Sequence, residues 1–336
     1  MSKQKRHDDH PDLGLIVEPD DGVKPVLDLI ASAHRSLHMI QFTLDDRRIV
    51  GAVIDAHRRK AAVRVLLNPQ KSSGERANDA TFKQLAHAGV AVEWAHPRFP
   101  VTHQKTIVVD DERALIATFN LSAKYFGETR DHGLVTENTV QVRAIHEAFE
   151  ADWRRRSFSP DDDNGLVWSP DNSRRLISAF IDGARHTLDV QHPKFVDATV
   201  IDRLSAAQDR GVRVRILCGG KHGLSAWDTH DTFASLRILG RGEVKVRRQK
   251  HPKVHAKLMV ADGVRALTGS MNLDRSAFDL RRELGAVVHA PAIVERLQKL
   301  FDHDWQKAEH WEAPDPLAFD THDVGELPHD PHFVHE

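Results

Sequence analysis

The chain has 336 residues, of which 40% are hydrophobic and 29% are charged, so it can bury enough apolar surface for about two domains. A formal net charge of −2 excludes a global positive field that would hold nucleic acid by counterion release. The single cysteine, Cys218, excludes an intramolecular disulfide. The first ten residues contain no apolar signal-peptide core, and no apolar run is long enough to cross a membrane. We therefore expect a cytoplasmic protein, and any contact that it makes with a membrane is expected to be peripheral.

The first half of the chain shows alternating strand and helix patterns. Residues 1–11 lack apolar periodicity and are expected to form a disordered tail. A strand is expected at 15–20, helices at 26–35 and 49–60, and a further strand at 63–66. This order favours α/β layering with a mainly parallel sheet.

A β-rich segment at 101–109 carries the first group of residues suited to chemistry. It contains His103 and Lys105, and Asp110 and Asn120 follow it. Alternate residues of a strand share one face, so the imidazole and the ammonium should line the same surface.

A polar segment at 157–165, SFSPDDDNG, is rich in turn formers and is expected to link two domains. The domains would span 12–156 and 166–311. Residues 312–336 are rich in His, Asp and Pro, and we expect a second disordered tail there.

The second half repeats the first at an offset of 151 or 152 residues. The strand at 166–171 resembles the one at 15–20, and 214–217 resembles 63–66. Helical patterns lie at 173–185 and 199–211. Such self-similarity indicates an internal duplication.

The second copy of the motif keeps the same residue types in the same register. His255, Lys257, Asp262 and Asn272 repeat the first group at an offset of 152 (255 minus 103, and 272 minus 120). Asp262-Gly263 is a tight-turn signal, so a hairpin should return Ser270 and Asn272 to the side of His255.

Two histidines and two lysines in one pocket suit the cleavage of a phosphodiester. Ammonium, amide and hydroxyl donors stabilise a phosphate oxygen whose negative charge grows in the transition state. One neutral imidazole can attack phosphorus, while the other, protonated, donates its proton to the leaving alcohol. We expect no metal and no cofactor in this chemistry.

The pattern HxKx4Dx6GSxN in the second copy, which the first copy nearly repeats, resembles the phospholipase D superfamily. The resemblance implies two tandem α/β sandwich domains related by pseudo-twofold symmetry, with the active site at their interface. It implies a catalytic set of His103, His255, Lys105, Lys257, Asp110 and Asp262. For the phosphate, the expected ligands are Lys105, Lys257, Asn120, Asn272, Thr118 and Ser270. Asp131 and Glu283 each lie eleven positions beyond their asparagine and are expected to orient the histidines.

Two of these expectations carry qualifications from the sequence itself. Asp110 and Asp262 sit past the strand end, which favours support of the hairpin turn over direct reaction. Ala117 stands where the second copy has Gly269, and its methyl group is expected either to narrow the substrate pocket or to require a shifted backbone.

The substrate is argued from architecture. Superfamily nucleases commonly carry one motif per chain, whereas this chain carries both halves, as phospholipases D and cardiolipin synthases do. We therefore expect a monomeric phosphodiesterase that hydrolyses or transfers a glycerophospholipid headgroup through a phosphohistidine at a membrane surface. A cluster of basic residues at 241–253 suits phospholipid headgroups and nucleic acid equally. A metal-independent nuclease and a noncatalytic anion-binding module remain the alternatives.

Overall fold

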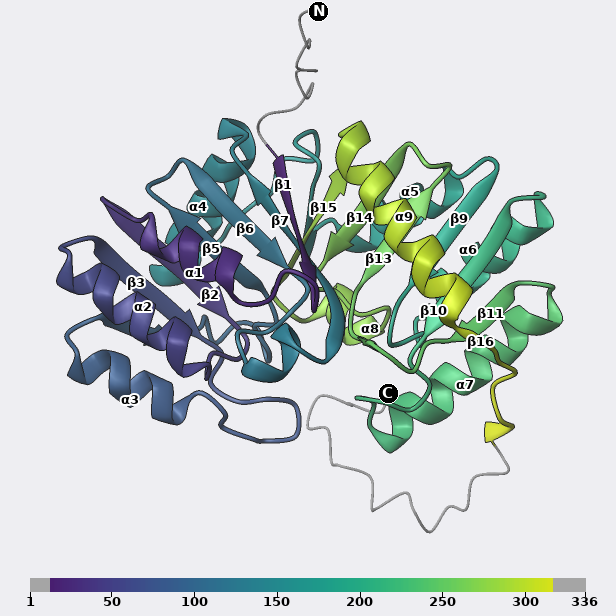
Figure 1. Ribbon diagram of the computed structural model, residues 1–336, viewed down its shortest axis with the longest axis horizontal. Helices are drawn as coiled ribbons and strands as arrows, with labels where there is room; N and C mark the ends of the chain where they lie inside the picture. The colour runs from purple at the N-terminus through teal and green to yellow at the C-terminus, as the bar shows by residue number, and fades with distance from the viewer. Residues whose placement is uncertain (1–12, 317–336) are drawn as a thin grey trace, which may run out of the picture.

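The computed structural model describes residues 13–316 (Figure 1). The expected N-terminal tail and residues 317–336 of the expected C-terminal tail lie outside this range. Residues 312–316 were also assigned to that tail, but Ala313 is buried in the core of the second half and its carbonyl accepts a hydrogen bond from Arg237. The ordered chain therefore extends beyond the expected domain end.

The first half contains all but one of the strands of one sheet and the helices on its two faces. Its elements are β1 (Leu13–Glu18), α1 (Lys24–Ala31), β2 (Ser36–Gln41), α2 (Arg47–Arg58), β3 (Ala62–Leu67), α3 (Asp79–His87), β4 (Ala91–Trp94), β5 (Lys105–Val109), β6 (Arg113–Ala117), the 3-10 helix η1 (Ala123–Phe126), β7 (Thr129–Thr136) and α4 (Thr139–Trp153).

The second half repeats this order. Its elements are β8 (Leu166–Ser169), α5 (Ser173–Asp182), β9 (Thr187–Gln191), α6 (Ala198–Asp209), β10 (Arg213–Cys218), α7 (Ala226–Arg241), β11 (Lys245–Arg248), β12 (Lys253–Val254), β13 (Leu258–Ala261), β14 (Arg265–Gly269), α8 (Arg275–Asp279), β15 (Glu283–Val288), α9 (Pro291–Lys307) and β16 (Glu309–His310).

Each sheet is mixed, so the expectation of a mainly parallel sheet is wrong. The first runs β1-β7-β6-β5-β2-β3-β4, and only β2, β3 and β4 pair in parallel along this path. The second runs β16-β11-β10-β9-β13-β14-β15-β8, with β9, β10 and β11 parallel. The motif segments lead into hairpins, β5-β6 and β13-β14, and hairpin strands are necessarily antiparallel.

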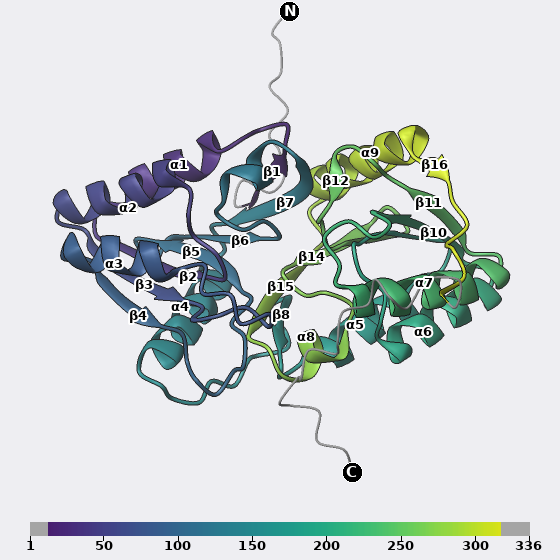
Figure 2. The same ribbon diagram turned by 90° about the horizontal axis from the view of Figure 1, so that it is seen from below.

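Helices cover both faces of each sheet. The packing of α1, α2 and α3 buries one core on the first sheet, and α5, α6 and α7 bury another on the second. Figure 2 shows α1–α3 along one side of the first half and α5–α7 along the opposite side of the second. This arrangement is what a pseudo-twofold axis between the halves produces, as the sequence predicted.

The two halves interlock through strands and a shared core. β12 of the second half pairs in parallel with β7 of the first, and Thr102 forms the equivalent bridge to Arg282. A third core takes residues from both sheets together with α4 and α9. Within residues 13–316, no helix is long and apolar enough to cross a membrane.

Candidate active site

His103 is held by an acid from the other half of the chain. Its Nδ1 lies 2.9 Å from Oε2 and 3.0 Å from Oε1 of Glu283, the first residue of β15. The imidazole therefore donates from Nδ1 and leaves Nε2 with its lone pair. Burial, opposed by the charges of Lys105 and Arg281, raises the pKa of Glu283 to about 7.

His255 is held in the mirrored way. Its Nδ1 lies 2.7 Å from Oδ1 of Asp131 on β7. Burial opposes ionisation of Asp131, but the neighbouring His255 and Lys257 outweigh it and hold the pKa of this carboxyl below its usual value. Both acids thus lie beside the histidine of the opposite half, where the resemblance expected histidine-orienting residues.

The backbone before each acid fixes the motif segment of the other half. The N–H groups of His103 and Gln104 donate to the carbonyl of Arg282, and those of His255 and Ala256 donate to the carbonyl of Arg130. Each of these hydrogen bonds crosses between the halves. Each histidine is therefore positioned by the neighbouring half through its backbone as well as through its side chain.

The two arginines are themselves locked in place. Arg130 forms a buried ion pair with Asp304 at 2.8 Å, and Arg282 forms one with Asp152 at 2.9 Å. The Arg-acid pair is duplicated at an offset of 152 in the sequence, so this repeat signal could have revealed the arginines, but the sequence analysis missed them.

The motif lysines lie beside the histidines. Lys257 Nζ is 3.2 Å from Nε2 of His255, and both lysines donate to the carbonyl of the motif histidine two residues before them. Burial lowers the pKa of Lys257 to about 8, with partial opposition from Asp131 and Glu283. It also lowers the pKa of Lys105 well below its usual value.

Both asparagines and both histidines line one pocket of about 860 Å³ between the halves. The side-chain amide oxygens of Asn120 and Asn272 are buried and have no hydrogen-bond partner. Because an amide can be flipped without changing its shape, either asparagine can present its NH₂ group to an anion. Two equivalent buried amide oxygens without partners in one pocket are therefore a site for a polar ligand.

Asp110 and Asp262 lie at the far end of the motif strands, so their place in the expected catalytic set is wrong. The carboxylate of Asp110 accepts backbone N–H groups of residues 34–36, and that of Asp262 accepts those of residues 185–187. Five residues of strand separate Asp110 from Lys105, which is roughly 16 Å. Both aspartates hold the loop before the neighbouring strand in place. The sequence favoured such a structural role, because both residues lie past the end of the motif strand.

Thr118 and Ser270 were expected to bind phosphate, and the structure contradicts this. The hydroxyl of Thr118 donates to Oδ1 of Asp131 at 2.5 Å, and that of Ser270 lies 3.3 Å from the carbonyl of Leu284. Both side chains are fully buried behind the acids. They support the acids and do not reach the pocket.

Aromatic rings and a further arginine complete the pocket. Phe42 lies against His103 and Tyr125 against His255, with ring centroids 4.5 and 4.7 Å apart. Arg281 lines the pocket near Glu283. The sequence analysis missed these rings, because nothing in the local sequence around them marks a pocket lining.

The family described as "Cardiolipin synthase, PLD-like domain" matches residues 26–153 and 177–305, one match in each half. The chain belongs to this phospholipase D-like family. Among curated relatives, this phospholipase D-like chain is 25% identical over 231 residues to cardiolipin synthase 2 of Staphylococcus epidermidis, covering 60% of the chain and 47% of that protein. It is 25% identical over 333 residues to the major cardiolipin synthase ClsA of Bacillus subtilis, covering 86% and 68%. The chain thus spans about half the length of the first of these relatives.

Solved structures share the fold of this phospholipase D-like chain. Phosphatidylserine synthase of Haemophilus influenzae superposes with a TM-score of 0.67 at 14% identity, covering 90% of the chain and 88% of that protein. Polyphosphate kinase of Porphyromonas gingivalis gives 0.69 at 16% identity, covering 88% and 47%. At such identities the likeness shows the fold alone, and it confirms the expected tandem architecture.

Proposed function

We propose that this protein is a phosphodiesterase that transfers or hydrolyses the headgroup of a glycerophospholipid through a covalent phosphohistidine. The observation that supports it most is the pair of histidines on one pocket, each held at Nδ1 by an acid of the other half. A binding protein would have no need of two imidazoles with their Nε2 atoms prepared in this way.

The surroundings of the two histidines favour different roles. Burial lowers the pKa of His255 to about 4, and the ionised Asp131 at its Nδ1 opposes this by stabilising the protonated form. We assign His255 as the general acid on the strength of this contact. His103 lies beside Glu283, whose pKa is raised to about 7, and burial lowers the pKa of His103 itself well below its usual value. A neutral His103 therefore serves as the nucleophile.

In the first step, Nε2 of His103 forms a bond to phosphorus and the bond from phosphorus to the leaving alcohol breaks. His255 donates its proton to that alcohol. In the second step, neutral His255 removes a proton from water or an acceptor alcohol, whose oxygen attacks phosphorus and releases His103. Water gives hydrolysis, and an alcohol gives transfer.

The remaining groups hold the phosphate. Lys105 and Lys257, which donate to the carbonyls of the motif histidines, supply positive charge beside the pocket. Asn120 and Asn272, which line the pocket, supply amide donors from opposite halves. Together they can surround the oxygens that gain charge in the transition state. These roles need no residue beyond the four.

A phospholipid is favoured over a nucleic acid by the relatives. The matching family and the curated relatives are named for cardiolipin synthase, whose product is a phospholipid. A nuclease and a noncatalytic anion-binding module remain the alternatives, and one assay separates all three.

Purified protein is incubated with phosphatidylglycerol vesicles, with and without added glycerol, and separately with single- and double-stranded oligonucleotides. We expect headgroup release or exchange from the vesicles and intact oligonucleotides. Oligonucleotide cleavage with inert vesicles would show a nuclease, and binding of vesicles without turnover would show an anion-binding module.

Replacing His103 or His255 with alanine tests the mechanism. Each variant should lose at least about 1000-fold in turnover, because each histidine performs a step that the other cannot. His87→Ala, at an exposed position at the end of α3, is the matched control and should retain full activity. Labelled phosphate trapped on His255 instead of His103 would reverse the assigned roles.

A further inference from the structure

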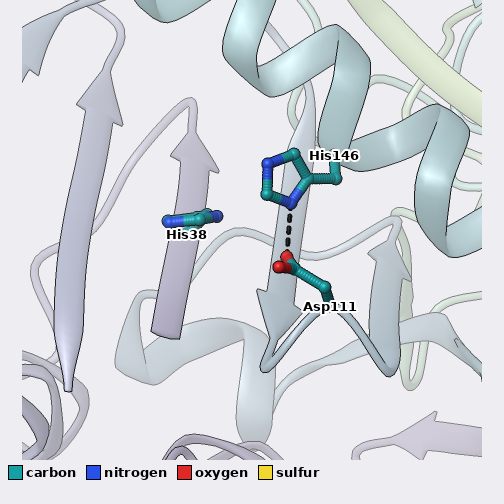
Figure 3. A group of neighbouring side chains, drawn as sticks. All are labelled: His38, Asp111 and His146. Atoms are coloured by element: carbon teal, nitrogen blue, oxygen red, sulfur yellow. Dashed lines mark hydrogen bonds and ion pairs between the residues drawn. The ribbon is translucent and has the colours of Figure 1, made fainter. Parts of the chain in front are cut away.

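Two histidines and an aspartate that do not line the pocket meet beside α4 in the first half. We propose that His38, Asp111 and His146 bind a divalent first-row transition-metal ion such as Zn²⁺. The three come from different elements: β2, the turn between β5 and β6, and α4 (Figure 3). Their donor atoms all lie within 4.8 Å of one another.

The donor set suits such an ion. Two imidazoles and one carboxylate are typical ligands of zinc and its neighbours in the first row. His146 Nδ1 already contacts the carboxylate of Asp111, and the rings of His38 and His146 meet edge to face with centroids 5.0 Å apart. Four-coordinate zinc would draw the donor atoms to about 3.4 Å from one another. Asp111 and His146 have partly exposed side chains and can make this adjustment by rotation.

One ligand atom is buried without a partner. His38 is 4% exposed, and its Nδ1 has no hydrogen bond, although buried polar atoms are nearly always paired. In Figure 3 the ring of His38 presents an edge toward Asp111 and His146.

The second half provides an internal comparison, because it has none of the three ligands. Asp189 occupies the place of His38, opposite Arg215 in the same register as His38 opposite Arg64. At the offset of 152, Gln298 stands for His146 and Gly263 for Asp111.

These second-half residues close an ion-pair network by themselves. Arg215 pairs with Asp189 at 2.6 Å and with Asp302 at 2.7 Å, and Gln298 donates to Asp189. At the corresponding positions the first half has two imidazoles and a carboxylate, whereas the second half has one carboxylate, a glutamine and a glycine. This difference between the halves supports a metal site.

The turn residue points the same way. Asp111 has a φ of +59°, a left-handed backbone in which Gly263 of the second copy is the less strained residue. The first half therefore retains a carboxylate at a position where glycine would cost less. The carboxylate contacts His146, and a bound metal would be held between the two groups.

Neighbouring charges set one condition on binding. Arg64 lies 3.0 Å from Nε2 of His38 and pairs with Glu150. Coordination through Nδ1 of His38 places the ring proton on Nε2, so Arg64 must give up that contact and keep its pair with Glu150. Glu150 Oε1 also lies 3.5 Å from Nε2 of His146, so it contacts the ring nitrogen other than the one beside Asp111.

Titration of the chelator-treated full chain with Co²⁺, followed by competition with Zn²⁺, tests the proposal. The wild type should bind one Co²⁺ per chain with visible d–d bands, and X-ray absorption should show two imidazoles at about 2.0–2.1 Å from zinc. Asp111→Gly and His146→Gln adopt the residue types of the second copy and should fold normally. Each should weaken this site on the order of 100-fold or more.

The chain has 23 histidines, and those outside this site can also bind cobalt. Comparing the variants with the wild type separates that binding from binding at this site. Gln298→Ala is the control and should bind cobalt as the wild type does. Arg64→Gln, which offers an acceptor to Nε2 of His38, should bind more tightly. Equal cobalt stoichiometry and affinity in the wild type, Asp111→Gly and His146→Gln would overturn the proposal, and weaker binding by Arg64→Gln would refute coordination through Nδ1 of His38. Turnover of phospholipid is not a readout, so the outcome is independent of the proposed function.

Discussion

At the scale of single residues, His255 has a second buried acid nearby, next to Asp131. Glu18, at the end of β1, lies opposite Asp131 in the sheet. Both of its carboxyl oxygens are buried without a hydrogen-bond partner. Burial and the charge of Asp131 raise the pKa of Glu18 to about 9. In the other half the equivalent place opposite Glu283 is occupied by Ser169, so only the Asp131 side carries this neutral acid.

Glu18→Gln should therefore stabilise the protein at alkaline pH. Folded Glu18 keeps its proton up to a pH of about 9, whereas in the unfolded chain it ionises above its ordinary pKa of 4.5. Between these values the ionised form favours unfolding, and glutamine removes that cost. We expect a gain of about 1–3 kcal/mol in the free energy of unfolding at pH 8 and no difference at pH 4. Denaturant unfolding at the two pH values measures this, and an equal effect at both would be inconsistent with a titrating Glu18.

Lys257 should set the alkaline limit of activity. Its pKa of about 8 means that it loses its positive charge, and with it the attraction for phosphate, as the pH rises through this value. We expect kcat/KM to fall about tenfold per pH unit above pH 8. In Lys257→Arg, whose guanidinium stays charged, this limb should disappear even if overall activity is lower. If the wild type and Lys257→Arg lose kcat/KM over the same alkaline pH range, a group other than Lys257 causes the loss.

At the scale of the elements, the difference between Ala117 and Gly269 has a packing cause. A Cβ on Gly269 would lie 2.3 Å from Cα of Gly285 and 2.6 Å from the carbonyl of Leu284, so β14 and β15 approach too closely for alanine. Ala117 is buried in the core beneath α1, α2 and α3 and does not line the pocket. The expectation that its methyl group narrows the substrate pocket is therefore wrong. The alternative, that alanine requires a different backbone position, agrees with the close contacts at Gly269.

Gly269→Ala and Ala117→Gly form a matched pair. The first should cost about 3 kcal/mol or more in the free energy of unfolding, because backbone atoms must move apart. The second should cost about 1–2 kcal/mol, from added chain entropy and one lost buried methyl group. Chemical unfolding compares them, and equal losses would mean that the sheet relaxes around the new methyl group.

The elements also show where sequence patterns stop being informative. The first helix was expected at 26–35 but ends at Ala31, since the N–H groups of residues 34–36 bind the carboxylate of Asp110. That partner is distant in the sequence, so periodicity could not reveal it. The hairpin at Asp262-Gly263 was predicted correctly, because its turn chemistry is local: both residues have positive φ.

At the scale of the whole molecule, the halves are repeats in sequence but not separate bodies in space. The core that α4 and α9 share is built from residues of both sheets. Each motif segment also donates backbone hydrogen bonds to the other half. The buried pairs of Arg130 with Asp304 and of Arg282 with Asp152 lie at this junction. Neither half can complete its own site alone, and the first sheet takes β12 from the second half.

Unfolding should consequently occur as one cooperative event. We expect a single calorimetric transition for the full chain, because loss of either half exposes the shared core. Leu284→Ala, in that core, should lower the midpoint of this one transition, at a cost of about 2–5 kcal/mol. Leu204→Ala, in the core of the second half alone, is the matched control and should also shift the whole transition. Two transitions, of which only one responds to Leu204→Ala, would indicate independent domains.

The sequence by itself determined the duplication, the family, the hairpins and the identity of the histidines, lysines and acids around the pocket. These features are carried by residue types at fixed spacing, which a repeat preserves. The tertiary structure alone decided which acid serves which histidine, because Glu283 meets His103 and Asp131 meets His255 only when strands from opposite halves pair. It also moved Thr118, Ser270, Asp110 and Asp262 out of the pocket, since a hydrogen-bond partner distant in sequence leaves no local signal. The meeting of His38, Asp111 and His146 is of the same kind, because three elements must pack before their side chains can face one another.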